Sequence, residues 1–204
     1  MASTIPTLFH SPNTRSSCVV ALIAELGLTP GKDIDIRTVS VTRADGTGGP
    51  DPVNPHPEGK VPFLTHGAES LRARGAIMLY LTDLFPEAGL GPREGEAGRG
   101  DYLSWLFYYH SVVEPVVLLK MSGLDHPFFT AAIRDFATMI ARLEETLSQG
   151  PWLLGDRFSA ADLLISGPFL WLPTLLENSP VLRQWVEAVA ARPSMTEVAR
   201  RDAA

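Results

Sequence analysis

The chain has 204 residues, of which 45% are hydrophobic and 20% are charged, and its formal net charge at pH 7 is -6. This composition is typical of a globular protein with one large domain or two small ones, and it argues against disorder. The acidic balance, with no basic face in the sequence, excludes the usual nucleic-acid partner. Since no run of about 18 apolar residues occurs, we expect no membrane-spanning helix.

The single cysteine, Cys18, excludes an internal disulfide framework and favours a reducing, cytoplasmic location. The first residues lack a basic region followed by an apolar one, so we expect no signal peptide. No Cys/His spacing predicts a metal site, and no Gly-rich phosphate loop occurs. We therefore expect no bound metal.

Up to residue 86, short apolar strands alternate with two amphipathic helices. The first helix carries Val19, Leu22 and Leu26 at helical spacing, and Gly27 is its expected cap. The expected elements are a strand at 7–9, a helix at 14–26, strands at 34–41, 61–65 and 69–71, and a helix at 73–85.

From residue 87 onward no segment resembles a strand. A Gly/Pro-rich linker is followed by one long helix at 101–121, in which Pro115 should produce a bend. Ser159 and Asp162 form an expected N-cap pair, because a carboxylate three residues after a capping serine can reach back to the helix start. The other expected helices lie at 127–147 and 182–191, and a further helix follows Ser159.

A polar Pro/Gly loop from Asn54 runs directly into Val61-Pro62-Phe63-Leu64. Proline has no N–H and rarely lies inside a strand, so Pro62 marks an edge, a kink or a cis bond. Such a bond would turn the amide and carbonyl of Val61 outward, where an extended peptide could pair with them. The alternative is an ordinary turn from loop to strand.

This string resembles the glutathione transferase loop in which a Val-Pro holds the cysteinyl part of glutathione. The Ser159-x-x-Asp162 box and the closing Arg192-Pro193 resemble that family's helical half. Spanning about residues 7 to 195, the resemblance implies a two-domain α+β/α fold in a cytoplasmic homodimer. It implies a thioredoxin-like glutathione-binding domain at 1–86, a linker at 87–100 and an all-helical substrate-binding domain at 101–204.

The family's chemistry is activation of the glutathione thiol, because the thiolate is the nucleophile. The resemblance places Ser16 or Thr14 at the start of the first helix as the hydroxyl that donates to this thiolate, and Arg15 could add positive charge there. Hydroxyls at a helix start are also common caps. Cys18 lies almost a turn too late for the cysteine of cysteine-type enzymes, and the alternatives are a packed side chain or a reactive thiol.

The next helix departs from the family pattern. Where relatives have Glu-Ser for the γ-glutamyl end of glutathione, this chain has Ala73-Arg74. Arg72 and Arg74 would clamp a carboxylate or another anion, or they point to solvent in a decayed pocket. The resemblance also implies that Lys60 contacts the glycyl carboxylate. The expected glutathione-binding residues are Lys60, Val61, Pro62, Ala73 and Arg74.

The resemblance places the second-substrate pocket on the first long helix, at Trp105, Tyr108, Tyr109 and His110. Aromatic residues at this spacing are also typical of a core. The function predicted is thus a glutathione transferase in which the thiolate attacks a small hydrophobic electrophile. The alternatives are a binding protein that kept the fold but altered its ligand, motivated by Ala73-Arg74, and a redox protein acting through Cys18.

Overall fold

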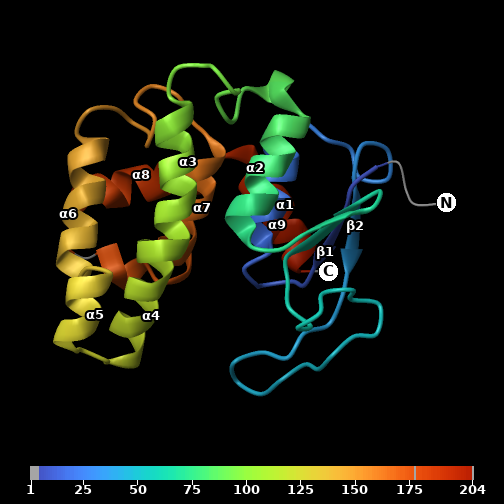
Figure 1. The fold of residues 1–204 in the computed structure, drawn as a ribbon, viewed down its shortest axis with the longest axis horizontal. Helices are drawn as coiled ribbons and strands as arrows, with labels where there is room; N and C mark the ends of the chain where they lie inside the picture. Colours follow the sequence, from blue (N-terminus) through green and yellow to red (C-terminus); the bar gives the residue numbers. More distant parts are fainter. Residues whose placement is uncertain (1–4, 177, 204) are drawn as a thin grey trace. The chain divides into compact units, whose positions relative to one another are not determined.

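The computed structural model describes residues 5–176 and 178–203 (Figure 1). The chain forms two compact units: one contains the segment up to Ala88 together with the segment from Pro193 onward, and the other is Gly89–Arg192. The expected helical domain included all residues from 101 to 204. The structure instead groups the segment from Pro193 onward with the first unit.

The first unit is built on a four-stranded sheet. Its strands are β1 (Thr7–His10), β2 (Asp35–Thr38), β3 (Phe63–His66) and β4 (Glu69–Leu71), in the order β2-β1-β3-β4. β1 is parallel to β2 and antiparallel to β3, and β3 is antiparallel to β4. Leu8 and Leu64 pair at the centre of the sheet and are both fully buried. β3 begins at Phe63 rather than at Val61, because Pro62 has no N–H to give to the sheet.

Three helices complete this unit: α1 (Ser17–Glu25), α2 (Arg74–Leu84) and α9 (Pro193–Asp202). The predicted helix start at Thr14 is wrong by three residues, because residues 12–16 form turns before α1 begins. Helix α9, which the sequence analysis did not predict and whose residues it placed in the helical domain, packs against α1 (Figure 1). The short 3-10 helix η1 (Pro86–Ala88) ends the first part of the chain.

In the second unit, the predicted long helix is present but contains a wider turn. It consists of α3 (Arg99–Tyr108), the π-helical segment η2 (Tyr109–Val113) and α4 (Glu114–Ser122). The N–H of Glu114 bonds to the carbonyl of Tyr109, five residues back. The next residue is Pro115, which has no N–H to donate, so the irregular turn lies where the sequence placed a bend.

The prediction of one helix over 127–147 is wrong. The structure has α5 (Pro127–Ala132) and α6 (Phe136–Leu147), separated by a break at Arg134, whose φ is 143°. The Asp135 carboxylate accepts the N–H of Thr138 at 2.6 Å and caps a new helix. A local cap therefore overrides the continuous apolar spacing on which the prediction rested.

The remaining helices are α7 (Ala160–Trp171), η3 (Pro173–Leu176) and α8 (Pro180–Ala190). The predicted capping box of α7 is confirmed, and Asp162 accepts the N–H of Ser159 at 2.9 Å. The largest side chains buried in this unit are Tyr102, Tyr109, Phe169, Leu106 and Met139. Within residues 5–176 and 178–203, no helix is both long and apolar enough to cross a membrane.

Candidate functional site

Three segments of the first unit meet at one edge of its sheet. Phe9 pairs with Phe63, so the turn after β1 lies beside the residues that precede β3. Leu64 pairs with Leu71, which places the start of α2 beside the same end of β3. The start of α1, the Val61-Pro62 bond and the start of α2 are therefore neighbours. These are the segments that the sequence predicted to bind glutathione.

The turn before α1 holds a cluster of hydroxyl groups. The Thr14 and Ser16 oxygens lie 2.7 Å apart, and the Thr14 hydroxyl also donates to the carbonyl of Ser11 at 2.7 Å. The N–H of Ser11 donates to the Ser16 oxygen at 3.1 Å. Ser16 is fully buried, whereas Thr14 is half-buried. Of the two predicted hydroxyls, Thr14 is thus the one that a ligand can reach directly.

Behind these hydroxyls lies a buried histidine. His10 Nδ1 is 2.8 Å from the Ser16 oxygen, and His10 Nε2 is 3.3 Å from Oδ1 of Asp202 at the end of α9. The other oxygen of Asp202 accepts the Ser17 hydroxyl at 2.7 Å. The side chain of His10 is only 1% exposed, and that of Asp202 is 13% exposed. Burial lowers the pKa of His10, and the nearby Asp202 carboxylate partly opposes this effect.

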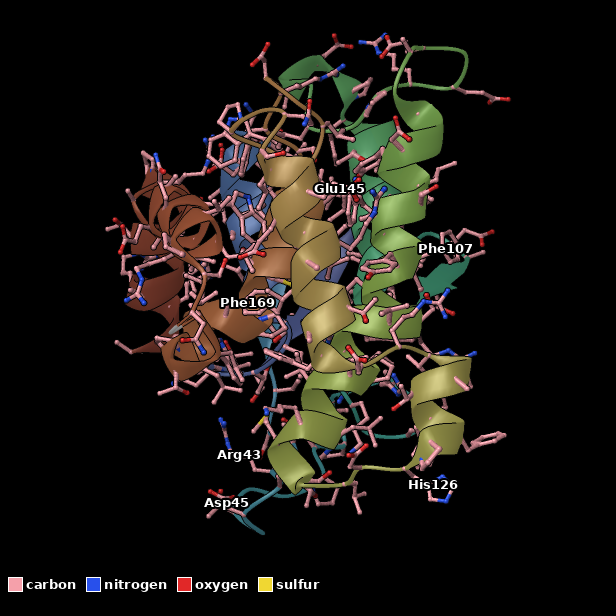
Figure 2. All side chains as sticks on the ribbon, turned by 90° about the vertical axis from the view of Figure 1, so that its left-hand side faces the viewer. Arg43, Asp45, Phe107, His126, Glu145 and Phe169 are labelled. Carbon is pink, nitrogen blue, oxygen red and sulfur yellow. The ribbon has the colours of Figure 1, made fainter. Side chains whose placement is uncertain are left out.

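The turn is also braced from a neighbouring loop. The Arg43 guanidinium donates to the carbonyl of Pro12 at 2.7 Å and to that of Asn13 at 3.3 Å. Figure 2 shows Arg43 beside Asp45 on the loop that follows β2. This contact fixes the backbone that leads into Thr14 and adds a positive charge near the start of α1, where helix N–H groups already favour an anion.

The Val61-Pro62 peptide bond is cis, one of the outcomes that the sequence predicted for Pro62. Val61 is half-buried and packs against a small apolar cluster formed by Phe9, Val39 and Phe63. Asn54 shapes the loop that leads to it: its amide donates to the Lys60 carbonyl at 3.1 Å. The Lys60 side chain is exposed.

Positive charge gathers at this edge. Burial is the main cause that lowers the pKa of His56, and Arg72 and Lys60 lower it further while Glu58 raises it. The His56 ring lies edge-on against Phe63, with the ring centres 5.2 Å apart. Because the lowered pKa disfavours the charged form of His56, Lys60 and Arg72 are the cations that this loop offers to an anion.

The start of α2 has an unusual backbone. Ala73, which replaces the family's Glu, has φ 64° and ψ 128°, and its side chain is exposed. Residues other than glycine rarely adopt a positive φ, and such residues gather at functional sites. Arg74 is 6% exposed, so the arginine that replaces the family's Ser is buried at the helix start rather than pointing to solvent. Arg72 is exposed.

Cys18 and Arg15 lie at the rim of the hydroxyl cluster. The Cys18 thiol is half-buried and donates to the carbonyl of Arg15 at 3.3 Å. The Arg15 side chain is exposed.

The four residues predicted for the second substrate do not form one group. The Trp105 and Tyr108 rings are in edge contact at 5.5 Å, and Arg142 of α6 lies 5.7 Å from the Trp105 ring centre. Burial raises the pKa of Tyr108. Tyr109 is 1% exposed and belongs to the core. His110 Nδ1 is 3.8 Å from the Glu114 carboxylate, in a half-buried position.

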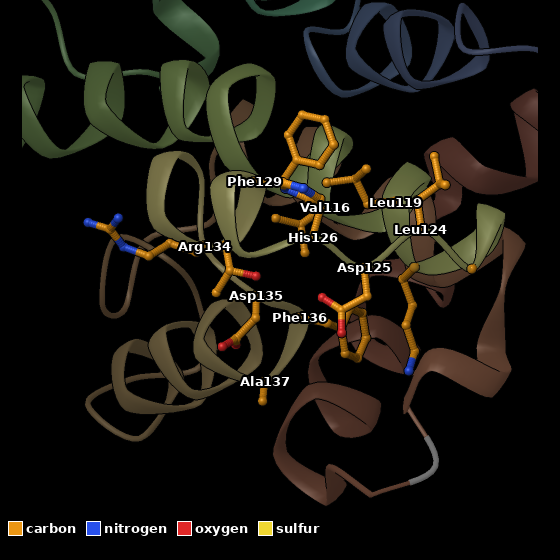
Figure 3. A pocket seen from close by; sticks show the side chains of 13 residues that line it. Val116, Leu119, Leu124, Asp125, His126, Phe129, Arg134, Asp135, Phe136 and Ala137 are labelled. Atoms are coloured by element: carbon orange, nitrogen blue, oxygen red, sulfur yellow. The ribbon is translucent and has the colours of Figure 1, made fainter.

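Two cavities lie within the helical unit. One, of about 430 Å³, is lined by Trp105 together with Arg142, Thr146 and Gln149. The other, of about 420 Å³, lies between α4, α5 and the start of α6, and no residue of the predicted set lines it. In this second cavity the polar groups of His126 and Asp135 are used as helix caps, and Arg134 extends away from the other lining side chains (Figure 3).

Sequence reasoning missed His10, Arg43 and Asp202. Asp202 lies 185 residues from the Ser17 hydroxyl that it accepts, so no local spacing connects the two. A histidine at the end of a buried strand was the one available signal, since such a side chain needs polar partners.

Comparisons with known proteins show what the chain resembles. The domain described as "Glutathione S-transferase, C-terminal domain" matches residues 124–193. The relative "Glutathione S-transferase psoE" of Aspergillus fumigatus is 26% identical, over 92% of this chain and 80% of its own. "Disulfide-bond oxidoreductase YfcG" of Escherichia coli is 28% identical, over 79% of this chain and 82% of its own.

A solved structure extends the likeness to the whole fold. A sphingomonad glutathione S-transferase, complexed with glutathione, superimposes with a TM-score of 0.76 at 26% identity. The match covers 97% of this chain and 98% of that one. A thioredoxin-like unit joined to a helical unit is the glutathione transferase fold, and the predicted fold class is confirmed. The chain therefore resembles glutathione transferases, including bacterial ones, in its C-terminal domain and in its whole fold.

Proposed function

We propose that the protein is a glutathione transferase that activates the glutathione thiol at the start of α1. The observation that carries the proposal is the half-buried Thr14 hydroxyl, which lies 2.7 Å from the buried Ser16 oxygen. A hydroxyl donor and the positive end of a helix both favour a thiolate over a thiol. The Thr14 hydroxyl contacts the sulfur, and the buried Ser16 hydroxyl forms a hydrogen bond with Thr14.

Glutathione fits the remaining features of the sheet edge. It carries two carboxylates, and the edge offers Lys60, Arg72 and the buried Arg74 as cations. Its peptide backbone can pair with the amide and carbonyl of Val61 beside the cis bond. The sphingomonad structure, which matches over 97% of this chain, contains glutathione.

Thr14→Val tests the role of the hydroxyl, because valine keeps the shape and removes the donor. We expect glutathione affinity by calorimetry to change less than threefold, while kcat/KM falls by about a hundredfold, the scale of one lost donor to a developing anion. Ser111→Ala, which removes an exposed hydroxyl in the helical unit, is the matched control. An unchanged kcat/KM in Thr14→Val would remove Thr14 from the chemistry.

The nucleophile's target is a small hydrophobic electrophile, held beside Trp105 and Tyr108. The half-buried His110, paired with Glu114, is a further polar contact for this second substrate. We also propose that the protein acts as a homodimer. Sedimentation that gives the chain mass of 22.2 kDa would contradict the dimer without affecting the chemistry.

A second candidate function is favoured by the start of α2. Ala73 cannot pair with the ammonium group of glutathione, and the buried Arg74 would suit an additional carboxylate. The protein would then be a binding protein for another anionic ligand. The double variant Ala73→Glu with Arg74→Ser decides between them by calorimetry. A gain in glutathione affinity of tenfold or more supports the second candidate, whereas a loss supports the first.

A further inference from the structure

A continuous line of polar groups connects the proposed thiol site to helix α9. From the inside outward, the steps are Asp202 Oδ1 to His10 Nε2 at 3.3 Å and His10 Nδ1 to the Ser16 oxygen at 2.8 Å. The last step joins the Ser16 oxygen to the Thr14 oxygen at 2.7 Å. His10 and Ser16 are almost fully buried, so Thr14 is the end of the line that a ligand reaches.

The charge of Asp202 sets the direction of the hydrogen bonds. An ionised carboxylate beside Nε2 favours the hydrogen of neutral His10 on that nitrogen, which leaves Nδ1 as an acceptor. The Ser16 hydroxyl then donates to Nδ1. When the Thr14 hydroxyl turns from the carbonyl of Ser11 to the Ser16 oxygen, the Thr14 oxygen accepts the N–H of Ser16 and keeps one lone pair for a ligand. A thiol that approaches Thr14 therefore meets a proton acceptor backed by a base.

We propose, resting on the function proposed above, that His10 and Asp202 are positioning residues that receive the thiol proton through two hydroxyls. The S–H bond breaks and its proton goes to the Thr14 oxygen. The Thr14 proton passes to Ser16, and the Ser16 proton passes to Nδ1 of His10. A neutral thiol and a neutral imidazole become a thiolate and an imidazolium, and the new Thr14 hydroxyl donates to the sulfur.

The surroundings of His10 suit this role. Burial is the main cause that lowers the pKa of His10, and Arg201 acts in the same direction. A lowered pKa favours the neutral imidazole, whose Nδ1 can accept a hydrogen, and it disfavours the imidazolium. In the part of the chain that the structure describes, the charged groups acting on His10 are Asp202 and Arg201, both on α9. Asp202 opposes the other two effects, so it stabilises the imidazolium once it forms.

A purely structural account would have Asp202 only fasten α9 to α1. The structure offers a matched test, because Asp202 makes two different contacts through its two oxygens. Oδ2 accepts the Ser17 hydroxyl at 2.7 Å, whereas Oδ1 faces His10. Ser17→Ala removes a tether between α1 and α9 but keeps the charge beside His10. Asp202→Asn keeps the shape of the side chain but removes that charge.

The experiment follows the ultraviolet absorption of the thiolate of bound glutathione as the pH is raised. We expect Asp202→Asn to bind glutathione with a similar Kd but to form the thiolate at a pH about one unit higher, a tenfold loss of thiolate at a given pH. Ser17→Ala should titrate like the unmodified protein. Equal titrations for the unmodified protein and Asp202→Asn would overturn the proposal, as would equal shifts in both variants.

A measurement on the unmodified protein remains decisive if Asp202→Asn fails to fold. Calorimetry of glutathione binding in buffers of different ionisation enthalpy counts the protons released. We expect the thiolate to form with little proton release, because the proton stays on His10. Release of one proton for each thiolate would overturn the proposal. If glutathione does not bind at all, the proposed function is wrong. That outcome is distinct from binding with proton release and from binding without it.

Discussion

Asp162 in the helical unit and Asp202 in the first unit are carboxylates that differ in their hydrogen-bond partners. Asp162 of the helical unit accepts the N–H groups of Leu153 and Ser159, both at 2.9 Å, and the indole N–H of Trp185 at 3.1 Å. In the first unit, Asp202 accepts one hydroxyl, and its other oxygen faces His10 without a hydrogen bond. The first carboxylate is saturated and holds the fold together, whereas the second keeps capacity for a change of charge.

The largest expected effect concerns Asp162, the carboxylate that holds the helical unit together. Asp162→Ala removes the acceptor of four donors, because the Ser159 hydroxyl also donates to this carboxylate, and each such loss typically costs about 1–3 kcal/mol. Burial of Asp162 raises its pKa, so removing the charge returns part of this loss. We expect the free energy of unfolding to fall by about 3–5 kcal/mol, measured by urea unfolding. A loss below about 1 kcal/mol would show that the hydrogen bonds do not hold α7 in place.

The same measurement on Asp202→Asn sharpens the contrast. The amide keeps the shape of the carboxylate and can still accept the Ser17 hydroxyl, so we expect a loss of only about 1 kcal/mol. Its main effect should fall on thiolate formation rather than on stability. A loss as large as that of Asp162→Ala would mean that both carboxylates are structural.

Among the described residues, positive φ values outside glycine occur at Asn13 and Ala73 in the first unit and at Arg134 in the second. Ala73 (φ 64°) lies at the proposed ligand edge, and Arg134 (φ 143°) lies at the break between α5 and α6. Glycine relieves the strain at either position, so we expect Ala73→Gly and Arg134→Gly each to change stability by less than about 1 kcal/mol. Only Ala73→Gly should alter the Kd for glutathione, by calorimetry. If Ala73→Gly and Arg134→Gly changed the Kd for glutathione equally, the positive φ of Ala73 would have no specific role in binding.

The difference between local and long-range contacts explains which features the sequence could predict. The capping box of α7 joins residues three positions apart, so a local pattern revealed it before the structure did. The approximate positions of the strands along the chain and the Val61-Pro62 feature were also accessible, because apolar strand patterns and proline chemistry are local. The break at Arg134 was missed, since one cap outweighed a continuous apolar spacing.

The polar line from Asp202 to Thr14 could not be predicted in the same way. Its members come from the end of β1, the turn before α1 and the last described helix. Only the packing of α9 on α1 brings them together, and the sequence analysis had placed that segment in the other domain. Residue identity suggested hydroxyl chemistry at Thr14 and Ser16, but the base behind them depends on a tertiary contact.

The smallest expected effect concerns a third carboxylate, on the same helix as Asp202 but on its outer side. Glu197 pairs with Arg200 and Arg201, both at 2.7 Å, and the bond to Arg200 is the main cause that lowers its pKa to about 2. Because the folded-state pKa is depressed, the pair stabilises the protein above the unfolded pKa of about 4.5 and loses this effect as the pH falls toward 2. Glu197→Gln should therefore lower stability at neutral pH by about 0.5 kcal/mol, as expected for an exposed pair, and the difference should vanish in acid. Thermal unfolding at neutral and acidic pH measures this difference.

If Glu197→Gln moved the thiolate titration as far as Asp202→Asn does, the charge of α9 as a whole, rather than the contact with His10, would control the thiol.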